Sequence, residues 1–319
     1  MSNEKIYPPY SDCFSAAWKA CFSLWPLFLV QLLFIVLQYV TLFFSVFLLL
    51  GPFLEKNWDQ IEEGLKAPNQ FDWTALGADA TAYFLNANWF LILLGVGVLY
   101  MLWWSLLSAL SDGGVYRAFW GHFQDRETFS LGAFFKNGAR FLLPILFSQT
   151  LLLAVCLVFS VGAVILVGIT AAVVSVLFAH SSLVGILLIL GGIPLGFIGV
   201  LLVLAFGAYV FLWKAQVTRM KDGGSGLSGA SKIAWDSMWE AGRKFRENRW
   251  RIGIGLTVAF LVYVIVSFIL RFFLGLMGHL PYIGIFFDLV DIVTATGFVV
   301  LFMSYMPALS VAYLLEEEM

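Results

Sequence analysis

The chain has 319 residues, of which 61% are hydrophobic and 12% charged, and its net charge at pH 7 is −2. Water-soluble domains carry about 45–50% apolar and about 25% charged residues, so this composition excludes a soluble globular fold and indicates a protein embedded in lipid. A net charge this close to zero also gives no electrostatic reason to expect a nucleic-acid partner.

Six apolar segments are long enough to cross the membrane, since a helix needs about 20 residues to span about 30 Å of hydrocarbon. The sequence therefore predicts an all-α integral membrane protein with a single transmembrane domain over residues 1–319. The expected spans are 25–50, 89–110, 145–178, 183–213, 252–274 and 292–315. The first span is expected to end at Gly51-Pro52, and the last has an alternative start at Ile285.

The third and fourth spans share an uncharged run over residues 141–213, which is too long for one helix. A turn at His180 divides this run into two balanced helices. A turn at 191–194 would leave one very long and one short helix, so we place the turn at His180 and expect Pro194 to kink the fourth span.

The positions of Lys and Arg predict the orientation, because loops rich in these residues stay in the cytoplasm. Fifteen of the 18 basic residues lie in the N-terminal segment and in the loops 111–140 and 214–251. The sequence therefore predicts three helical hairpins with both termini in the cytoplasm and the acidic loop 52–88 outside.

A short amphipathic helix is expected before each odd-numbered span. In the surface helix 11–23, Phe14, Trp18 and Phe22 recur every four residues and share one face. Trp235 and Trp239 stand beside basic residues before the fifth span, and 134–141 has a similar pattern before the third. Aromatic and basic residues on opposite faces are typical of helices that lie in the membrane interface.

An internal repeat is indicated by two aligned segments. Pro26-Leu-Phe-Leu-Val-Gln31 matches Pro144-Ile-Leu-Phe-Ser-Gln149 at a constant offset of 118 residues. The third unit, which includes the fifth span, matches only in pattern. We interpret the chain as three copies of a surface helix followed by a hairpin.

The aromatic surface helices at 11–22 and 234–245 resemble those of six-helix bacterial membrane proteins related to the membrane domain of glycerophosphodiester phosphodiesterases. The resemblance extends over most of the chain in architecture. It implies a bacterial inner-membrane location. It implies no catalysis, because the phosphodiesterase of those enzymes is a separate soluble domain that these residues do not contain.

The densest basic patch lies just before the fifth span. Juxtamembrane Lys and Arg attract anionic lipid, and they also fix topology. The candidate lipid or partner patch comprises Arg243, Lys244, Arg246, Arg249 and Arg251.

Polar residues within the apolar segments form two candidate groups. Gln31 and Gln38 are seven residues apart on the first span, and Gln149 repeats the position of Gln31. Polar side chains in membranes commonly hydrogen-bond a neighbouring helix; a hydrophilic substrate path is the alternative. On the outer side, Arg271 is expected to pair with Asp288 or Asp291, and the alternative is a cation or proton site.

The sequence contains no catalytic constellation, and it predicts no enzyme activity, cofactor or metal site. Gly224-Ser-Gly226-Leu-Ser-Gly229 has the letters of a dinucleotide fingerprint, but no strand precedes it. In the first outer loop, Trp58 and Ile61 belong to an apolar helical stripe that is a candidate docking surface.

These patterns favour a non-enzymatic inner-membrane protein that organises anionic lipid or scaffolds a protein complex or a second copy of the chain. The alternative hypothesis is a transporter or channel for a small solute, an ion or a lipid. The repeat, the polar stripe and Gly192-x-x-x-Gly196 support this alternative.

Overall fold

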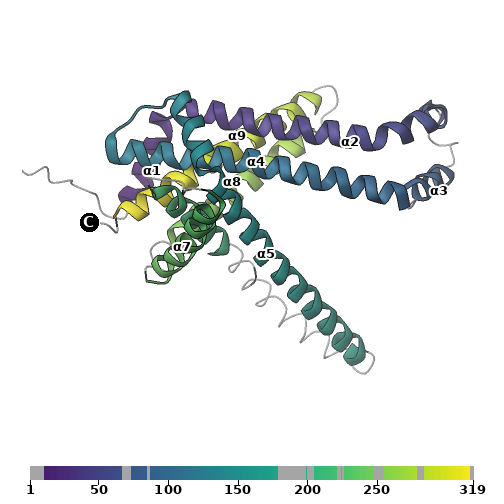
Figure 1. Ribbon diagram of the computed structural model, residues 1–319. Helices are drawn as coiled ribbons and strands as arrows, with labels where there is room; N and C mark the ends of the chain where they lie inside the picture. The colour runs from purple at the N-terminus through teal and green to yellow at the C-terminus, as the bar shows by residue number, and fades with distance from the viewer. Residues whose placement is uncertain are drawn as a thin grey trace, which may run out of the picture. The chain divides into compact units, whose positions relative to one another are not determined.

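The computed structural model describes residues 11–66, 73–84, 87–178, 199, 205–220, 224, 226–247, 254–278 and 284–316. These ranges contain helices and no strand, in agreement with the predicted all-α class. In chain order the helices are α1 (Ser11–Ser23), α2 (Pro26–Lys66), α3 (Trp73–Phe84), α4 (Ala87–Asp125), α5 (Leu131–Phe178), α7 (Gly226–Glu247), α8 (Ile254–Gly278) and α9 (Gly284–Glu316), with a further helix over 205–219 before α7 (Figure 1).

Five of these helices are long and apolar enough to cross a membrane. The candidate spans are Pro26–Gly64, Leu91–Asp125, Leu131–Leu157, Ile254–Leu274 and Val290–Leu315. The chain is therefore a multi-pass helical membrane protein. The predicted span 183–213 and its turn at His180 lie outside the described residues, apart from 199 and 205–213.

Helix α2 extends beyond the first predicted span, and much of the predicted outer loop 52–88 is helical. Helix α2 continues through Pro52 to Lys66, and α3 occupies most of the remaining loop. A proline removes only one helical hydrogen-bond donor, and membrane helices tolerate that loss. Downstream, Phe53 and Asn57 are buried, and the Asn57 amide donates to the Phe53 carbonyl at 2.9 Å, so this part of α2 has a packed face of its own.

Most of the predicted cytoplasmic loop 111–140 is helical. Helix α4 continues to Asp125, and α5 starts at Leu131 and passes through Pro144 without a break. Asp112 and Arg117 carry charges, yet Tyr116, Phe119 and Trp120 between and after them are fully buried. Burial of these aromatic side chains holds the segment in a helix despite its charges.

The three predicted surface helices differ in how they join the next helix. Helix α1 ends at Ser23, and a two-residue turn separates it from α2. Helix α7 is described to Glu247 and α8 from Ile254, whereas the second surface helix is simply the first part of α5. The α1 and α7 helices bury small residues, which allows close packing: Cys13, Ala17 and Ala20 in α1, and Ala230, Ala234 and Ser237 in α7.

The three cysteines, which all lie in described helices, form no disulfide bond. Cys13 and Cys21 are buried on α1, whereas Cys156 is exposed on α5. Burial raises the pKa of the Cys21 thiol to about 12, so this side chain acts as a small apolar residue at neutral pH.

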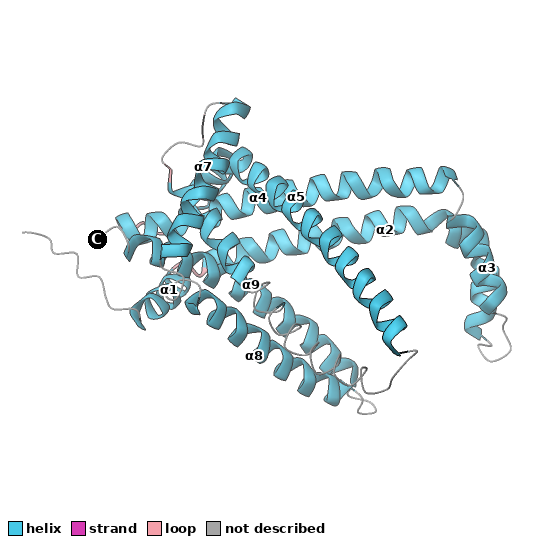
Figure 2. Cartoon of the chain, turned by 90° about the horizontal axis from the view of Figure 1, so that it is seen from below, coloured by secondary structure: helices cyan, strands magenta, loops and turns pink. Residues whose placement is uncertain are grey.

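The chain forms two compact units. The smaller unit is Leu33–Ser108, and the larger unit contains residues up to Leu32 together with Ala109 onward. Within the larger unit, α9 packs against both α8 and α1, and α5 packs against α7 (Figure 2). Helix α9 is the core of this unit. In its most apolar 18-residue stretch 67% is buried, compared with 6% in the corresponding stretch of α8.

Candidate functional site

An apolar groove of about 410 Å³ lies between α1, α8 and α9 in the larger unit. Helix α1 closes one end of it: the Trp18 and Tyr305 rings lie 5.8 Å apart, and the Tyr305 hydroxyl donates to the Phe14 carbonyl at 3.5 Å. Within the groove, the rings of Tyr263 and Phe302 stack with their centroids 4.2 Å apart. The groove is lined by Phe14, Trp18, Val258, Ala259, Val262, Tyr263, Val266, Phe298, Leu301, Phe302 and Tyr305.

A second groove of about 290 Å³ continues along the same two helices, since it shares Tyr263 and Phe298 with the first. Its wall is more polar. Ser267 and Arg271 of α8 face Thr294 of α9 across it. The two grooves together form one continuous depression along α8 and α9. It has aromatic rings at one end and the Arg271 guanidinium at the other.

The predicted ion pair at the outer side is not among the ion pairs of the described side chains. Arg271 is exposed and lines the second groove, while Asp291 is half-buried on α9, one helical turn before Thr294. The Asp291 Oδ1 atom is buried and has no hydrogen-bond partner within the described part of the chain. The side chain of Asp288 lies outside the described residues.

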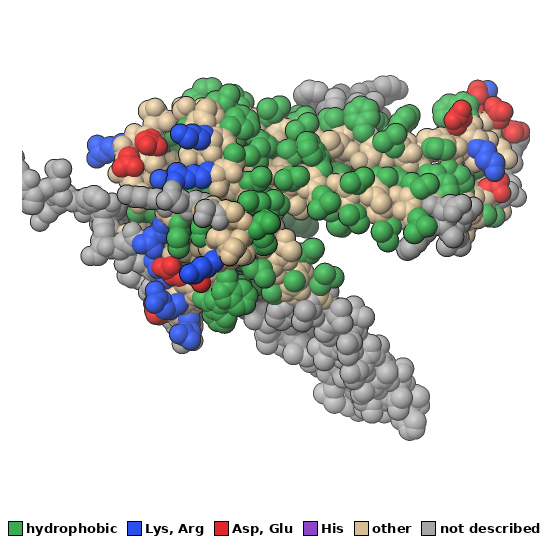
Figure 3. Space-filling model, viewed as in Figure 1, with side chains coloured by type: hydrophobic (Ala, Val, Ile, Leu, Met, Phe, Trp, Pro, Cys, Tyr) green, Lys and Arg blue, Asp and Glu red, His purple; other side chains and the backbone are tan. Residues whose placement is uncertain are grey.

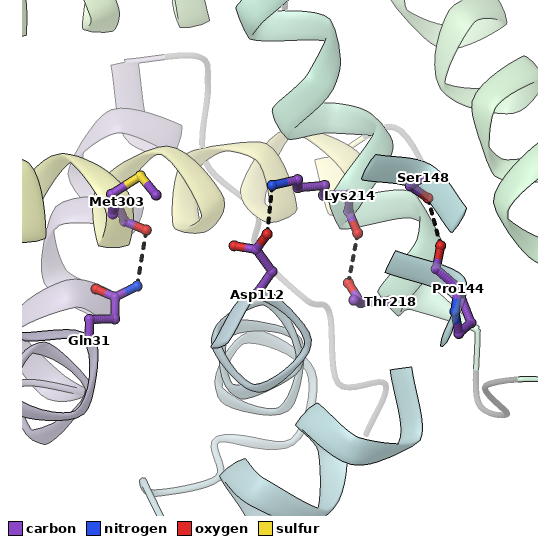
Figure 4. Close-up of polar contacts among 7 residues, drawn as sticks. All are labelled: Gln31, Asp112, Pro144, Ser148, Lys214, Thr218 and Met303. Atoms are coloured by element: carbon purple, nitrogen blue, oxygen red, sulfur yellow. Dashed lines mark hydrogen bonds and ion pairs between the residues drawn. The ribbon is translucent and has the colours of Figure 1, made fainter. Parts of the chain in front are cut away.

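The Gln31 amide connects α2 to α9. Its Nε2 donates to the Met303 carbonyl at 3.2 Å (Figure 4). Its Oε1 accepts a hydrogen bond from the Ser304 hydroxyl. Gln31 is only 5% exposed, so this contact is a buried bond between helices of the kind predicted for the polar stripe.

The other two glutamines of the predicted polar group are placed differently. Gln38 is buried in the smaller unit, where its main-chain carbonyl accepts a bond from the Thr41 hydroxyl at 2.9 Å. Gln149 is half-buried on α5. The seven-residue spacing along α2 therefore runs from one unit into the other.

Replacing Gln31 with leucine is expected to lower the free energy of unfolding by about 1–2 kcal/mol, because Met303 and Ser304 lose their bonds to α2. Thermal unfolding in detergent measures the effect. The control is Thr150→Val, whose exposed hydroxyl bonds only the Leu146 carbonyl of its own helix at 2.9 Å. Equal midpoints for the two variants would contradict this role for Gln31.

The predicted basic patch lies at the end of α7. Arg243 and Arg246 are exposed and Lys244 is half-buried, whereas Arg249 and Arg251 lie outside the described residues. On the viewed face of the larger unit, Lys and Arg side chains gather around α7 (Figure 3). The same helix exposes Trp235 and Trp239, whose rings meet edge-to-face at 6.0 Å.

The candidate docking stripe lies on the last part of α2. Trp58 is 54% exposed, and Ile61 is half-buried. Within the smaller unit, the ring centroids of Phe53 and Tyr83 of α3 lie 5.2 Å apart, and those of Tyr83 and Trp89 of α4 lie 4.6 Å apart. Trp58 lies on the same helix as Phe53, and its side chain is exposed.

Sequence reasoning missed a buried ion pair in the larger unit. The Lys214 Nζ lies 2.6 Å from the Asp112 carboxylate, and their side chains are only 17% and 14% exposed (Figure 4). Around it, the Trp120 indole donates to the Ala215 carbonyl at 3.1 Å, and the Trp213 indole donates to the Ala234 carbonyl at 3.0 Å. The predicted spans 89–110 and 183–213 end just before these two residues, and no local pattern indicates that Asp112 and Lys214 pair.

No protein-family model, no curated protein and no solved structure matches this chain. The grooves, the surface helices and the charges described above are therefore the features that bear on function.

Proposed function

We propose that this chain is a non-enzymatic membrane protein that binds and organises lipid. The observation that carries the proposal is the apolar groove between α1, α8 and α9. Helices α8 and α9 are candidate membrane spans, so the groove opens where acyl chains are the available occupants. An acyl chain that enters the groove packs against the half-buried rings of Tyr263 and Phe302, which gain van der Waals contacts.

The surface helices supply the second part of the argument. Helices α1 and α7 bury small residues toward the protein and expose aromatic pairs, Trp18 with Phe22 and Trp235 with Trp239. Exposed Trp and Phe side chains favour the boundary between acyl chains and headgroups. The exposed Arg243 and Arg246 beside them attract anionic lipid, at about 1 kcal/mol for each charge near the surface.

The proposal includes the topology inferred from the sequence: six spans in three hairpins, both termini in the cytoplasm, and a location in a bacterial inner membrane. Its support is the distribution of Lys and Arg. The proposed repeat is supported by burial at its aligned positions, since Leu27 and Ile145 are both fully buried and Val30 and Ser148 are both at most 8% exposed.

Transport is a weaker hypothesis, because Gln31, one residue of the polar stripe that suggested a hydrophilic path, is bonded to another helix. Both ends of the Gln31 amide are occupied by α9. Scaffolding of a protein partner through the exposed Trp58 remains compatible with lipid binding, because Trp58 belongs to the smaller unit and the groove to the larger one.

The test fills the groove. We expect Ala259→Phe, which places a ring among the lining residues, to reduce the number of phospholipids that stay bound when the protein is released from nanodiscs into a mass spectrometer. Ile269→Phe is the matched control, because Ile269 is 49% exposed on α8 and lines neither groove. Retention of the same lipid number by Ala259→Phe and the wild type would refute the proposal.

A further inference from the structure

The second groove adds polar chemistry to one end of the apolar groove. Arg271 and Ser267 line it from α8, and Thr294 lines it from α9. Arg271 lies seven residues before the end of α8 at Gly278, which is about 10 Å along the helix at 1.5 Å per residue. Its guanidinium is therefore placed to reach from the hydrocarbon toward the headgroups of the leaflet at this end of α8.

Two buried polar atoms at this end have no hydrogen-bond partner in the described part of the chain. One is the Ser267 hydroxyl oxygen, which belongs to the groove wall, and the other is Asp291 Oδ1. Nearly all buried polar atoms in folded proteins have a hydrogen-bond partner, so an unpaired one indicates a place where a ligand can supply that bond. Asp291 precedes Thr294 by three positions and therefore shares its helix face.

The charges at this end are complementary to a zwitterion. Among the described side chains at this end of α8 and α9, Arg271 is the cation and Asp291 the anion, and they form no ion pair with each other. A guanidinium binds phosphate through two parallel hydrogen bonds. A carboxylate with a free oxygen binds a group that carries both positive charge and N–H donors.

We propose that this end of the groove selects a phospholipid with a phosphoethanolamine headgroup. The phosphate binds Arg271, the primary ammonium binds Asp291, and an acyl chain follows the groove past Tyr263 and Phe298. A choline headgroup has no N–H to donate to Asp291, and a glycerol headgroup has no cation. This inference rests on the proposed lipid-binding function and adds the headgroup class.

The experiment uses the full-length chain in nanodiscs that contain equal amounts of phosphatidylethanolamine, phosphatidylglycerol and phosphatidylcholine. Native mass spectrometry identifies the lipids that stay bound. We expect the wild type to retain phosphatidylethanolamine about five-fold over each of the other two, as one extra charge contact allows. Asp291→Asn should abolish this preference, and Asp291→Glu should keep it.

Arg271→Met should reduce retention of all three lipids about five-fold, since each of them presents a phosphate. Lys136→Met is the control, because Lys136 is exposed on α5 and lines neither groove. A thermal unfolding curve for each variant identifies loss of fold, and Asp291→Glu keeps the test decisive if Asp291→Asn is unstable.

An unchanged preference for phosphatidylethanolamine in Asp291→Asn would overturn the headgroup assignment. If Ala259→Phe still releases lipid in that case, the lipid-binding function stands and only the headgroup site falls. If Ala259→Phe also keeps its lipid, both proposals fail.

Discussion

Replacing Asp112 with leucine is expected to destabilise the chain by about 3–5 kcal/mol, the largest single effect that the structure predicts. The substitution leaves the Lys214 ammonium buried without its carboxylate, with only 17% of the side chain exposed. Removing a charge from water is costly, and without Asp112 no attraction offsets that cost. Equilibrium unfolding by a denaturing detergent, in a mild detergent background, measures the loss.

Lys214→Met should cost a similar amount, because it leaves the Asp112 carboxylate buried and unpaired. The double variant Asp112→Leu with Lys214→Met should be more stable than either single variant, since neither charge is then stranded. The exposed pair Lys66–Glu62, with side chains 72% and 46% exposed, is the control, and breaking it should change stability by less than about 1 kcal/mol. Single and double effects that simply add would contradict a coupled buried pair.

Gly138→Ala is expected to lower the free energy of unfolding by about 1–3 kcal/mol, the usual range for overpacking. A methyl group at this position would lie 2.5 Å from the Leu110 carbonyl oxygen of α4 and 3.1 Å from the Leu110 side chain. A backbone oxygen cannot rotate away, so α4 and α5 would have to separate. On α4, a methyl group added at Gly113 would likewise lie 3.2 Å from Gly138 Cα.

Gly97→Ala is the matched control for this effect. Gly97 also lies inside α4, but a methyl group there would meet no atom within 4 Å. Both substitutions gain helix propensity, worth up to about 1 kcal/mol, so their difference isolates the contact between α4 and α5. Thermal unfolding in the same detergent compares them, and equal stability of Gly97→Ala and Gly138→Ala would show that this contact is not tight.

The membrane class and the helical content were predictable from composition, but the helix ends were not. Hydropathy identifies where a helix is apolar, and it does not identify where the helix stops. At Gly51-Pro52 the chain loses one hydrogen-bond donor, and the packed face around Phe53 and Asn57 continues the helix to Lys66. The predicted second span ends at residue 110, just before the charge of Asp112, although Lys214, about a hundred residues away, neutralises that charge.

Part of the candidate site was also predictable. The polar stripe predicted that Gln31 bonds another helix, and α9 supplies both partners. The grooves were not predictable, because they depend on how far α8 and α9 separate and on the side chains left between them, such as Tyr263 and Phe298. No local pattern in either helix determines that spacing.

Photo-crosslinking with a phospholipid that carries a diazirine in its acyl chain tests the central claim most directly. The full-length protein is illuminated in liposomes, and the modified peptides are identified by mass spectrometry. We predict that labelling concentrates on groove residues such as Phe298 and Phe302, several-fold above Phe43 and Phe47, which are 67% and 58% exposed on α2. Equal labelling of the groove and of these exposed α2 rings would mean that the groove contacts lipid no more than any other membrane-facing surface does. That result would contradict a lipid-binding groove.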